Sequence, residues 1–293
     1  MTINKRAGRS IKKNKSFYII SIILTTLTSL VIVGAISTGH TLKNVVNDFV
    51  EKYKAEDAEF VTYKPMDDED IKKLEKEYDV LVEYSRYKDI KCKGGDLKGT
   101  TLRVFDMPEK LNLCEIREGH KPGTGETLLT QDFADIHGIR VGDTISCGKY
   151  SYQVSAYTTK SDYIYMLEKL SGYIDNEKFA VMVVNDQEYD QIDAEETGYY
   201  SIKYQKDNSK KVREKLNKEY VVASYLAATS NTRISMPVNE GDAVTNMATL
   251  YAPVMFIIII TLIVMILGRN IKNEQYLLGA FLALGFSRKQ IIG

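Results

Sequence analysis

Residues Phe17–Ser37 read FYIISIILTTLTSLVIVGAIS, and this run decides the architecture of the chain. No charged side chain lies between Lys15 and His40. About 20 apolar residues in a helix cross the roughly 30 Å hydrocarbon core of a bilayer. The Ser and Thr hydroxyls inside the run can bond to carbonyls one helical turn back. We therefore predict a transmembrane helix over residues 17–38.

A cleaved signal peptide is the alternative interpretation of the same run. Basic residues precede it, and Val33, Gly34 and Ala35 would offer a small-residue cleavage site. The apolar core of a signal peptide usually spans about 7–15 residues, which is shorter than this run. The length therefore favours a retained span.

A second uncharged run, Ala248–Gly268, reads ATLYAPVMFIIIITLIVMILG. Pro253 lies near its start, where proline fits the first turn of a helix or kinks it. We predict a second transmembrane helix over residues 248–268.

Charge predicts the orientation of the two helices. The chain has 293 residues with 39 basic and 39 acidic side chains, so no overall basic excess indicates nucleic-acid binding. Residues 1–16 hold six basic side chains and no acidic one, and residues 269–293 also carry a net positive charge. Because basic segments stay in the cytoplasm, we expect a multi-pass protein of the plasma membrane with both termini cytoplasmic. The acidic segment 40–247 is then extracytoplasmic.

The segment between the runs predicts a mixed α/β domain, which makes the chain an α+β membrane protein with two flanking transmembrane helices. Alternating and β-branched residues predict strands, and apolar residues at helical spacing predict helices. We place an α/β body at 55–106 and 178–228, interrupted by a small β-rich lobe at 107–177. Residues 161–174 are a linker or short helix. We expect strands at 58–63, 80–87, 100–105, 178–184, 198–204 and 220–226, and helices at 67–78, 131–138 and 208–220.

A basic cytoplasmic arm (1–16) precedes the first span, and a stalk (229–246), extended and then helical, leads to the second. The last segment, 269–293, is predicted to be cytoplasmic. It is apolar but interrupted at Gly279 and Gly285, and Ser287 is a candidate cap for a following helix.

Sequence motifs for phosphate binding, metal binding or catalysis are weak throughout the chain. KPGTGET (Lys121–Thr127) has Glu126 where a phosphate-binding loop needs lysine. The three histidines are not at metal-ligand spacing. Three cysteines leave one unpaired even if two form a disulfide, and free thiols are an equal alternative. We expect a non-enzyme with no cofactor of its own. A tyrosine-lined ligand patch is a minor alternative, formed by Tyr163, Tyr165, Tyr199 and Tyr200.

The stretch GAFLALGFSRKQI (Gly279–Ile291) resembles the segment that follows the second span in FtsX/MacB-like ABC transporter permeases. Leu277 replaces the usual acidic residue and Leu282 the usual basic one. The basic arm and the run EGHKPGTGETLLTQDFADIHGIRVGDTI also resemble that family. The matching positions form an expected ATPase-coupling segment: Gly279, Ala283, Leu284, Gly285, Ser287, Arg288, Lys289 and Gln290.

The resemblance implies mechanotransmission, in which a partner ABC-type ATPase binds and hydrolyses ATP and the spans move the extracytoplasmic domain. It also implies a second permease copy or half. No ionisable residue lies within either run, so neither predicts an ion path. Because such permeases have at least four spans, we expect this chain to be the N-terminal part of a longer permease.

Two other functions fit a two-span layout. A sensory receptor would place a ligand-binding domain between the spans and a signalling module after them. A polysaccharide co-polymerase would need long helical hairpins outside, which the strand-rich pattern disfavours. A heptad linker after Gly268 would favour the sensor, and a glycine-interrupted segment favours the permease.

Overall fold

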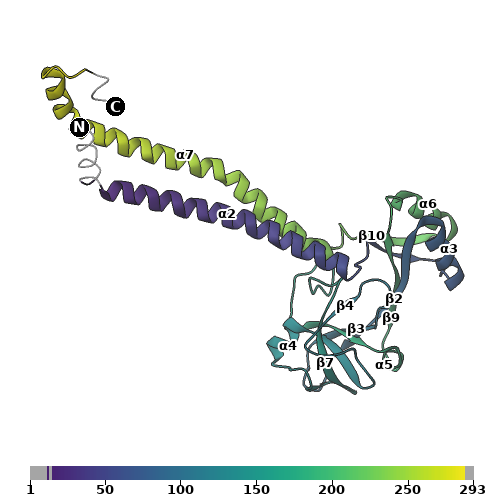
Figure 1. Cartoon of the computed structure of the whole chain (residues 1–293). Helices are drawn as coiled ribbons and strands as arrows, with labels where there is room; N and C mark the ends of the chain where they lie inside the picture. The colour runs from purple at the N-terminus through teal and green to yellow at the C-terminus, as the bar shows by residue number, and fades with distance from the viewer. Residues whose placement is uncertain (1–11, 13–14, 288–293) are drawn as a thin grey trace. The chain divides into compact units, whose positions relative to one another are not determined.

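The structure is a computed structural model, and it describes residue 12 and residues 15–287 (Figure 1). The chain divides into two compact units. One unit is formed by both ends of the chain, residues 1–41 with 240–293, and the other by Leu42–Asn239. The coupling-segment residues Arg288, Lys289 and Gln290 lie outside the described residues.

Two long helices contain the two predicted spans. Helix α2 covers Lys15–Lys52 and helix α7 covers Thr232–Ala283. Both are long and apolar enough to cross a membrane, with mean hydropathy of 2.5 and 2.9 in their most apolar windows. Almost none of these windows is buried. The large apolar side chains therefore face outward, which is unusual for a helix in water.

Hydroxyl side chains inside these helices bond to their own backbone, as the sequence predicts. Ser21 donates to the Phe17 carbonyl at 2.9 Å, and Thr25 donates to the Ser21 carbonyl at 2.8 Å. Thr261 does the same to the Ile257 carbonyl in α7. These polar groups are therefore satisfied without water.

Within the helical unit, Gly39 of α2 lies directly against residues 241 and 245 of α7. A Cβ atom added to Gly39 would lie 2.2 Å from Thr245 Oγ1 and 2.5 Å from the Gly241 carbonyl oxygen. Only glycine permits this separation, because any other residue would push the backbones apart.

The other unit is built on one ten-stranded sheet with the order β10-β1-β9-β2-β3-β8-β5-β7-β4, in which β6 pairs with β7. Most neighbours are antiparallel, but β3 pairs with β8 in parallel and β5 with β7 in parallel. The strands are β1 (Ala58–Thr62), β2 (Val80–Lys91), β3 (Thr101–Asp106), β4 (Cys114–Arg117), β5 (Glu126–Thr130), β6 (Thr144–Cys147), β7 (Tyr150–Lys160), β8 (Phe179–Val184), β9 (Glu196–Tyr204) and β10 (Val222–Ala227).

Helices α3 (Asp68–Tyr78) and α6 (Ser209–Glu219) lie at the β10 end of the sheet (Figure 1). Their buried residues Leu74, Val212 and Leu216 share one apolar cluster with strands β1, β2 and β9. The side chain of Asp67 caps α3 by accepting from the Asp70 amide at 2.8 Å. Helix α4 (Gln131–His137) packs on a second cluster, together with the short helix α5 (Asp186–Asp190).

Several details differ from the sequence predictions. The strands of segment 107–177, predicted as an inserted lobe, belong to the same sheet as the body, since β5 pairs with β8. Segment 161–174 contains no helix or strand. The predicted interruption at Gly279 is wrong, because α7 continues through it to Ala283. Helix α5 and strand β4 are absent from the sequence predictions because both are too short for a periodic signal.

Cys92 and Cys147 form a disulfide, which settles an alternative that the sequence left open. It joins the chain just after β2 to the end of β6, across 55 residues of sequence. Cys114 is the free cysteine, and burial raises the pKa of its thiol to about 12. A neutral buried thiol is chemically inert.

We predict one reactive thiol per chain under denaturing, non-reducing conditions and three after reduction, because the disulfide protects two cysteines. Polymer-maleimide labelling followed by a gel-shift assay measures this directly. The Cys114→Ser variant is the control and should show no labelling before reduction. Two or three labelled thiols in the unreduced protein would contradict the pairing.

Candidate functional site

The predicted coupling segment ends α7 in a defined hydrogen-bonded cap. Gly285 adopts a φ of 88°, in the left-handed region that favours glycine. Its amide donates to the Leu282 carbonyl, and the Phe286 amide donates to the Phe281 carbonyl at 3.1 Å. The rings of Phe281 and Phe286 lie 5.4 Å apart, edge to face. This is the Schellman arrangement that stops a helix and redirects the chain.

The other coupling residues that the structure describes lie at this helix end. Gly279 and Ala283 are on the last turns of α7, the exposed Leu284 comes directly after the helix, and Ser287 follows the cap. The described part of the segment is therefore a helix stop with an exposed surface.

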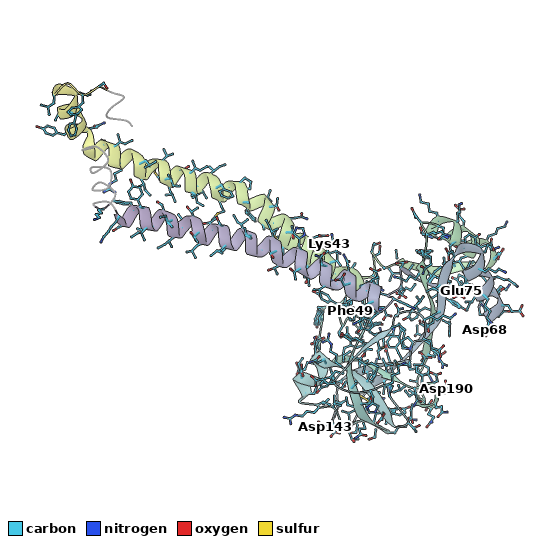
Figure 2. All side chains as sticks on the ribbon, viewed as in Figure 1. Lys43, Phe49, Asp68, Glu75, Asp143 and Asp190 are labelled. Atoms are coloured by element: carbon cyan, nitrogen blue, oxygen red, sulfur yellow. A yellow bond between two sulfur atoms is a disulfide. The ribbon has the colours of Figure 1, made fainter. Side chains whose placement is uncertain are left out.

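A second site lies within the α/β unit, where α2 ends against the sheet. Phe49 (labelled in Figure 2) is on the last turn of α2, and Tyr53 directly follows the helix; their rings are tilted, with centroids 4.7 Å apart. The amides of Asn112 and Leu113 donate to the carbonyls of Lys54 and Tyr53 at 3.0 and 2.9 Å. These bonds satisfy carbonyls that the end of a helix would otherwise leave unpaired.

Asn112 is fully buried and uses its whole amide group at this helix end. Its Oδ1 accepts from the Glu56 amide at 2.9 Å, while its Nδ2 donates to Glu56 Oε2 at 2.8 Å and to Ser201 Oγ at 2.9 Å. Ser201 belongs to β9, so one side chain ties the exit of α2 to the middle of the sheet.

The start of α7 is held by an equivalent set of bonds. Arg233, which is 9% exposed, donates through Nε to the Leu167 carbonyl at 3.0 Å and through Nη2 to the Glu168 carbonyl at 3.2 Å. Its guanidinium lies 4.4 Å from the centre of the Tyr163 ring. Thr232 Oγ1 donates to the Leu170 carbonyl at 2.9 Å. The irregular segment 161–174 is therefore a clamp on the first turn of α7.

Arg103 on β3 holds the same irregular segment from the sheet side. It forms a bidentate pair with Asp89, at 2.8 and 2.7 Å, and its Nη1 donates to Tyr163 Oη and to the Glu168 carbonyl. Although burial lowers the pKa of Arg103, its hydrogen bond to Asp89 and the other anionic partners raise it overall. Arg103 therefore stays charged.

A buried ion pair lies between the two helix ends. Lys160 at the end of β7 lies 2.7 Å from both carboxylate oxygens of Asp162, and each side chain is only 2% exposed. Tyr199 Oη donates to the same carboxylate at 3.2 Å. The neighbouring Ser161 hydroxyl donates to the Tyr53 carbonyl, which connects this pair to the end of α2. We call this set the helix–sheet junction: Tyr53, Glu56, Asn112, Lys160, Asp162, Tyr199 and Arg233.

Glu56 is the junction residue whose charge is least compensated. Its side chain is buried, and its Oε1 has no hydrogen-bond partner among the described residues. Burial, followed by the negative charges of Asp162 and Glu59, raises its pKa to about 8. Burial is also the main cause that raises the pKa of Glu59. Glu56 is therefore protonated at neutral pH.

The predicted tyrosine patch is not one exposed surface. Tyr163, Tyr199 and Tyr200 are buried, and the first two lie in one apolar cluster of the sheet. Tyr165 is half-buried, and its amide donates to the Arg233 carbonyl. Tyr199 instead belongs to the junction, and the Tyr163 ring lies against Arg233 of the junction. No periodic pattern or motif in the sequence indicates Asn112, Lys160, Asp162 or Arg233.

In the phosphate-loop-like segment Lys121–Thr127, the side chain of Glu126 bonds to the backbone of the same segment. The carboxylate of Glu126 accepts from the Gly123 amide at 2.8 Å and contacts His120 Nε2 at 3.1 Å. The Gly123 amide is the main cause that lowers the pKa of Glu126. The Gly123 amide is thus already bonded to a side chain of the same segment. No cluster of metal-ligating side chains occurs among the residues that the structure describes.

We predict that Lys160→Met destabilises the α/β unit by about 3–5 kcal/mol, because it leaves the Asp162 carboxylate buried without a cation. The double variant Lys160→Met/Asp162→Asn should recover most of this loss, since it removes both charges and keeps an acceptor for Tyr199. The free energy of unfolding in detergent measures both. Lys149→Met is the control, because its pair with Asp193 is exposed and such pairs contribute below about 1 kcal/mol. Equal losses of unfolding free energy in Lys160→Met and Lys149→Met would contradict a structural role for the buried Lys160–Asp162 pair.

We predict that stability falls between about pH 5 and pH 8 because of Glu56. The folded state keeps a proton that the unfolded state releases, so each pH unit in this window costs up to about 1.4 kcal/mol. Above about pH 8 this contribution no longer changes. Glu56→Gln should flatten the slope, leaving the smaller part that Glu59 contributes, whereas the exposed control Glu214→Gln should not. Unfolding free energies measured at several pH values test this, and parallel curves for both variants would contradict it.

Comparison with known proteins provides no family. No family model matches the chain, and no curated protein matches it. A solved structure named "Putative Lipoprotein from Bacillus anthracis" is 9% identical, with a TM-score of 0.28, over 58% of this chain and 96% of that one. A likeness this weak establishes neither fold nor function.

Proposed function

We propose that the chain is a permease subunit of an FtsX/MacB-like ABC transporter, which couples ATP hydrolysis by a partner ATPase to movement of the α/β unit. In this proposal, α2 and α7 cross the plasma membrane, both ends of the chain are cytoplasmic, and Leu42–Asn239 is extracytoplasmic. The ATP is bound by the partner and not by this chain.

The outward-facing apolar surface of the helices supports membrane insertion. Val31 is 70% exposed and Leu250 is 68% exposed, among many similar residues on α2 and α7. Water disfavours such surfaces by roughly 25 cal/mol per Å², and lipid removes this cost.

Two features support the extracytoplasmic position of the α/β unit. The basic arm and the basic end of the chain favour cytoplasmic termini. The Cys92–Cys147 disulfide is typical of an oxidising compartment.

The helix–sheet junction is the observation that carries the proposal. Each apolar helix continues unbroken into the α/β unit, and each is fixed there by buried hydrogen bonds: α2 through Asn112, and α7 through Arg233. Displacing either helix end would leave buried polar groups unpaired, which costs about 1–3 kcal/mol for each group. In this proposal, the two anchored helix ends are the points at which movement reaches the α/β unit.

A sensory receptor is the second candidate, and one observation favours it. Helix α7 continues past Gly268 to Ala283, as a signalling helix would. The stop at Gly285 favours the permease, because a receptor usually needs an uninterrupted helix into its signalling module. The exposed helix end then provides the surface that a cytoplasmic ATPase would contact.

The test is crosslinking to an ABC-type ATPase. We expect the adjacent gene to encode this ATPase, and we expect Leu284→Cys to crosslink to it in native membranes, because Leu284 is 74% exposed at the helix end. Glu69→Cys on α3 is the matched control and should not crosslink, since it would lie across the membrane.

The outcome separates the two candidates. Arg233→Met should leave the crosslink intact but lower the permease-dependent part of ATP hydrolysis several-fold, because it loosens the clamp on α7. An adjacent histidine kinase or methyl-accepting module, or a crosslink from Glu69→Cys alone, would overturn the permease proposal.

A further inference from the structure

An open groove of about 870 Å³ lies on the α/β unit, beside the helix–sheet junction. Its apolar part includes Met107, Leu113, Ile116 and Pro122. The last residues of α2, Lys52 and Tyr53, also line it. This volume lies within the range of about 300–1,000 Å³ that is typical of ligand sites.

The groove runs past a free strand edge. Strand β4 is the last strand of the sheet order, and it pairs with β7 on one side only. The Ser161 amide donates to the Leu113 carbonyl, which fixes the alternation of the antiparallel pairing. The backbone groups of Cys114 and Ile116 therefore point away from β7. Such an edge is a template for an additional extended strand.

Two charges of each sign line the groove without an ion partner. Lys52 and Lys121 are exposed cations, and Glu109 and Asp186 are exposed anions. None of the four forms a salt bridge within the part of the chain that the structure describes; Lys52 lies 4.9 Å from the Tyr53 ring instead. Glu109 and Asp186 also line an adjacent smaller pocket together with Glu83 and Asp106. Lys160 lines this pocket too, but it is paired with Asp162, so that end of the groove is acidic.

We propose that this groove binds an extended peptide segment that adds to the outer edge of β4, with an apolar side chain against Ile116. Its positively charged residue lies toward Glu109 and Asp186, and its acidic residue or terminal carboxylate lies toward Lys52 and Lys121. A peptide fits better than a lipid chain because the lining combines backbone donors and acceptors with charges of both signs.

The bound peptide would contact Tyr53, whose carbonyl accepts from the Leu113 amide where α2 ends. Occupancy would therefore stabilise the position of that helix end. Only this coupling step rests on the proposed permease function, since peptide binding itself requires neither ATP nor a partner.

The experiment uses the full chain in lipid nanodiscs without ATPase, and a fluorescent library of end-capped heptapeptides with apolar residues at alternate positions. We expect heptapeptides with one basic and one acidic end to bind at least tenfold more tightly than the same sequences with glutamine at both ends. Backbone N-methylation at alternate residues should lower the affinity of the best heptapeptide a further tenfold, because it removes the strand hydrogen bonds.

Variants of the groove locate the site. Glu109→Lys/Asp186→Lys should invert the preference at one end of the heptapeptide from basic to acidic, and Ile116→Glu should abolish binding. Glu214→Lys on α6 is the matched control and should bind like the unchanged protein, and melting temperatures verify that each variant is folded.

The proposal is overturned if no heptapeptide binds below about 1 mM. It is also overturned if the Glu109→Lys/Asp186→Lys variant keeps the preference of the unchanged protein for a basic peptide end. It is also overturned if Ile116→Glu instead abolishes self-association of the chain, because the groove would then hold a second copy. Peptide binding with no effect on ATP hydrolysis would overturn only the coupling step.

Discussion

Burial of charge is the constraint on which the α/β unit depends. Lys160 and Asp162 lie almost without solvent contact between the ends of two long helices, so each requires the other. Arg233 is likewise buried, and its guanidinium donates to two carbonyls of a segment some 65 residues earlier. Because an unpaired buried charge costs several kcal/mol, segments distant in sequence cannot separate independently. The irregular stretch 161–174 is ordered for this reason and not by regular secondary structure.

Glu56 is also buried, but it is neutralised by a proton and not by a cation. It has an amide partner in Asn112 but no cation, and two further carboxyl groups are near it. The group therefore avoids the cost of burial by keeping a proton. A neutral Glu56 still fixes the exit of α2 through its hydrogen bonds. The junction thus combines one firmly charged pair with one carboxyl whose charge depends on pH.

The parts of the structure that follow from local pattern were predictable from the sequence. The apolar runs and the helices predicted at 67–78 and 208–220 follow from periodicity. The junction was not predictable, because Asn112, Lys160 and Arg233 act through contacts that only the sheet order brings together. The extension of α2 to Lys52 was missed for a related reason: its polar last turns are stabilised by Asn112 and Leu113, not by propensity.

Hydrogen bonds fix both ends of α7, which is the helix that crosses the bilayer second in the proposed permease. Its first turn is fixed by Arg233 and Thr232, and its last turn is fixed by the cap at Gly285. Between them, backbone hydrogen bonds maintain the 1.5 Å rise per residue. A fixed helix end resists the local unfolding that a frayed end would show. Gly285 therefore sets where α7 ends.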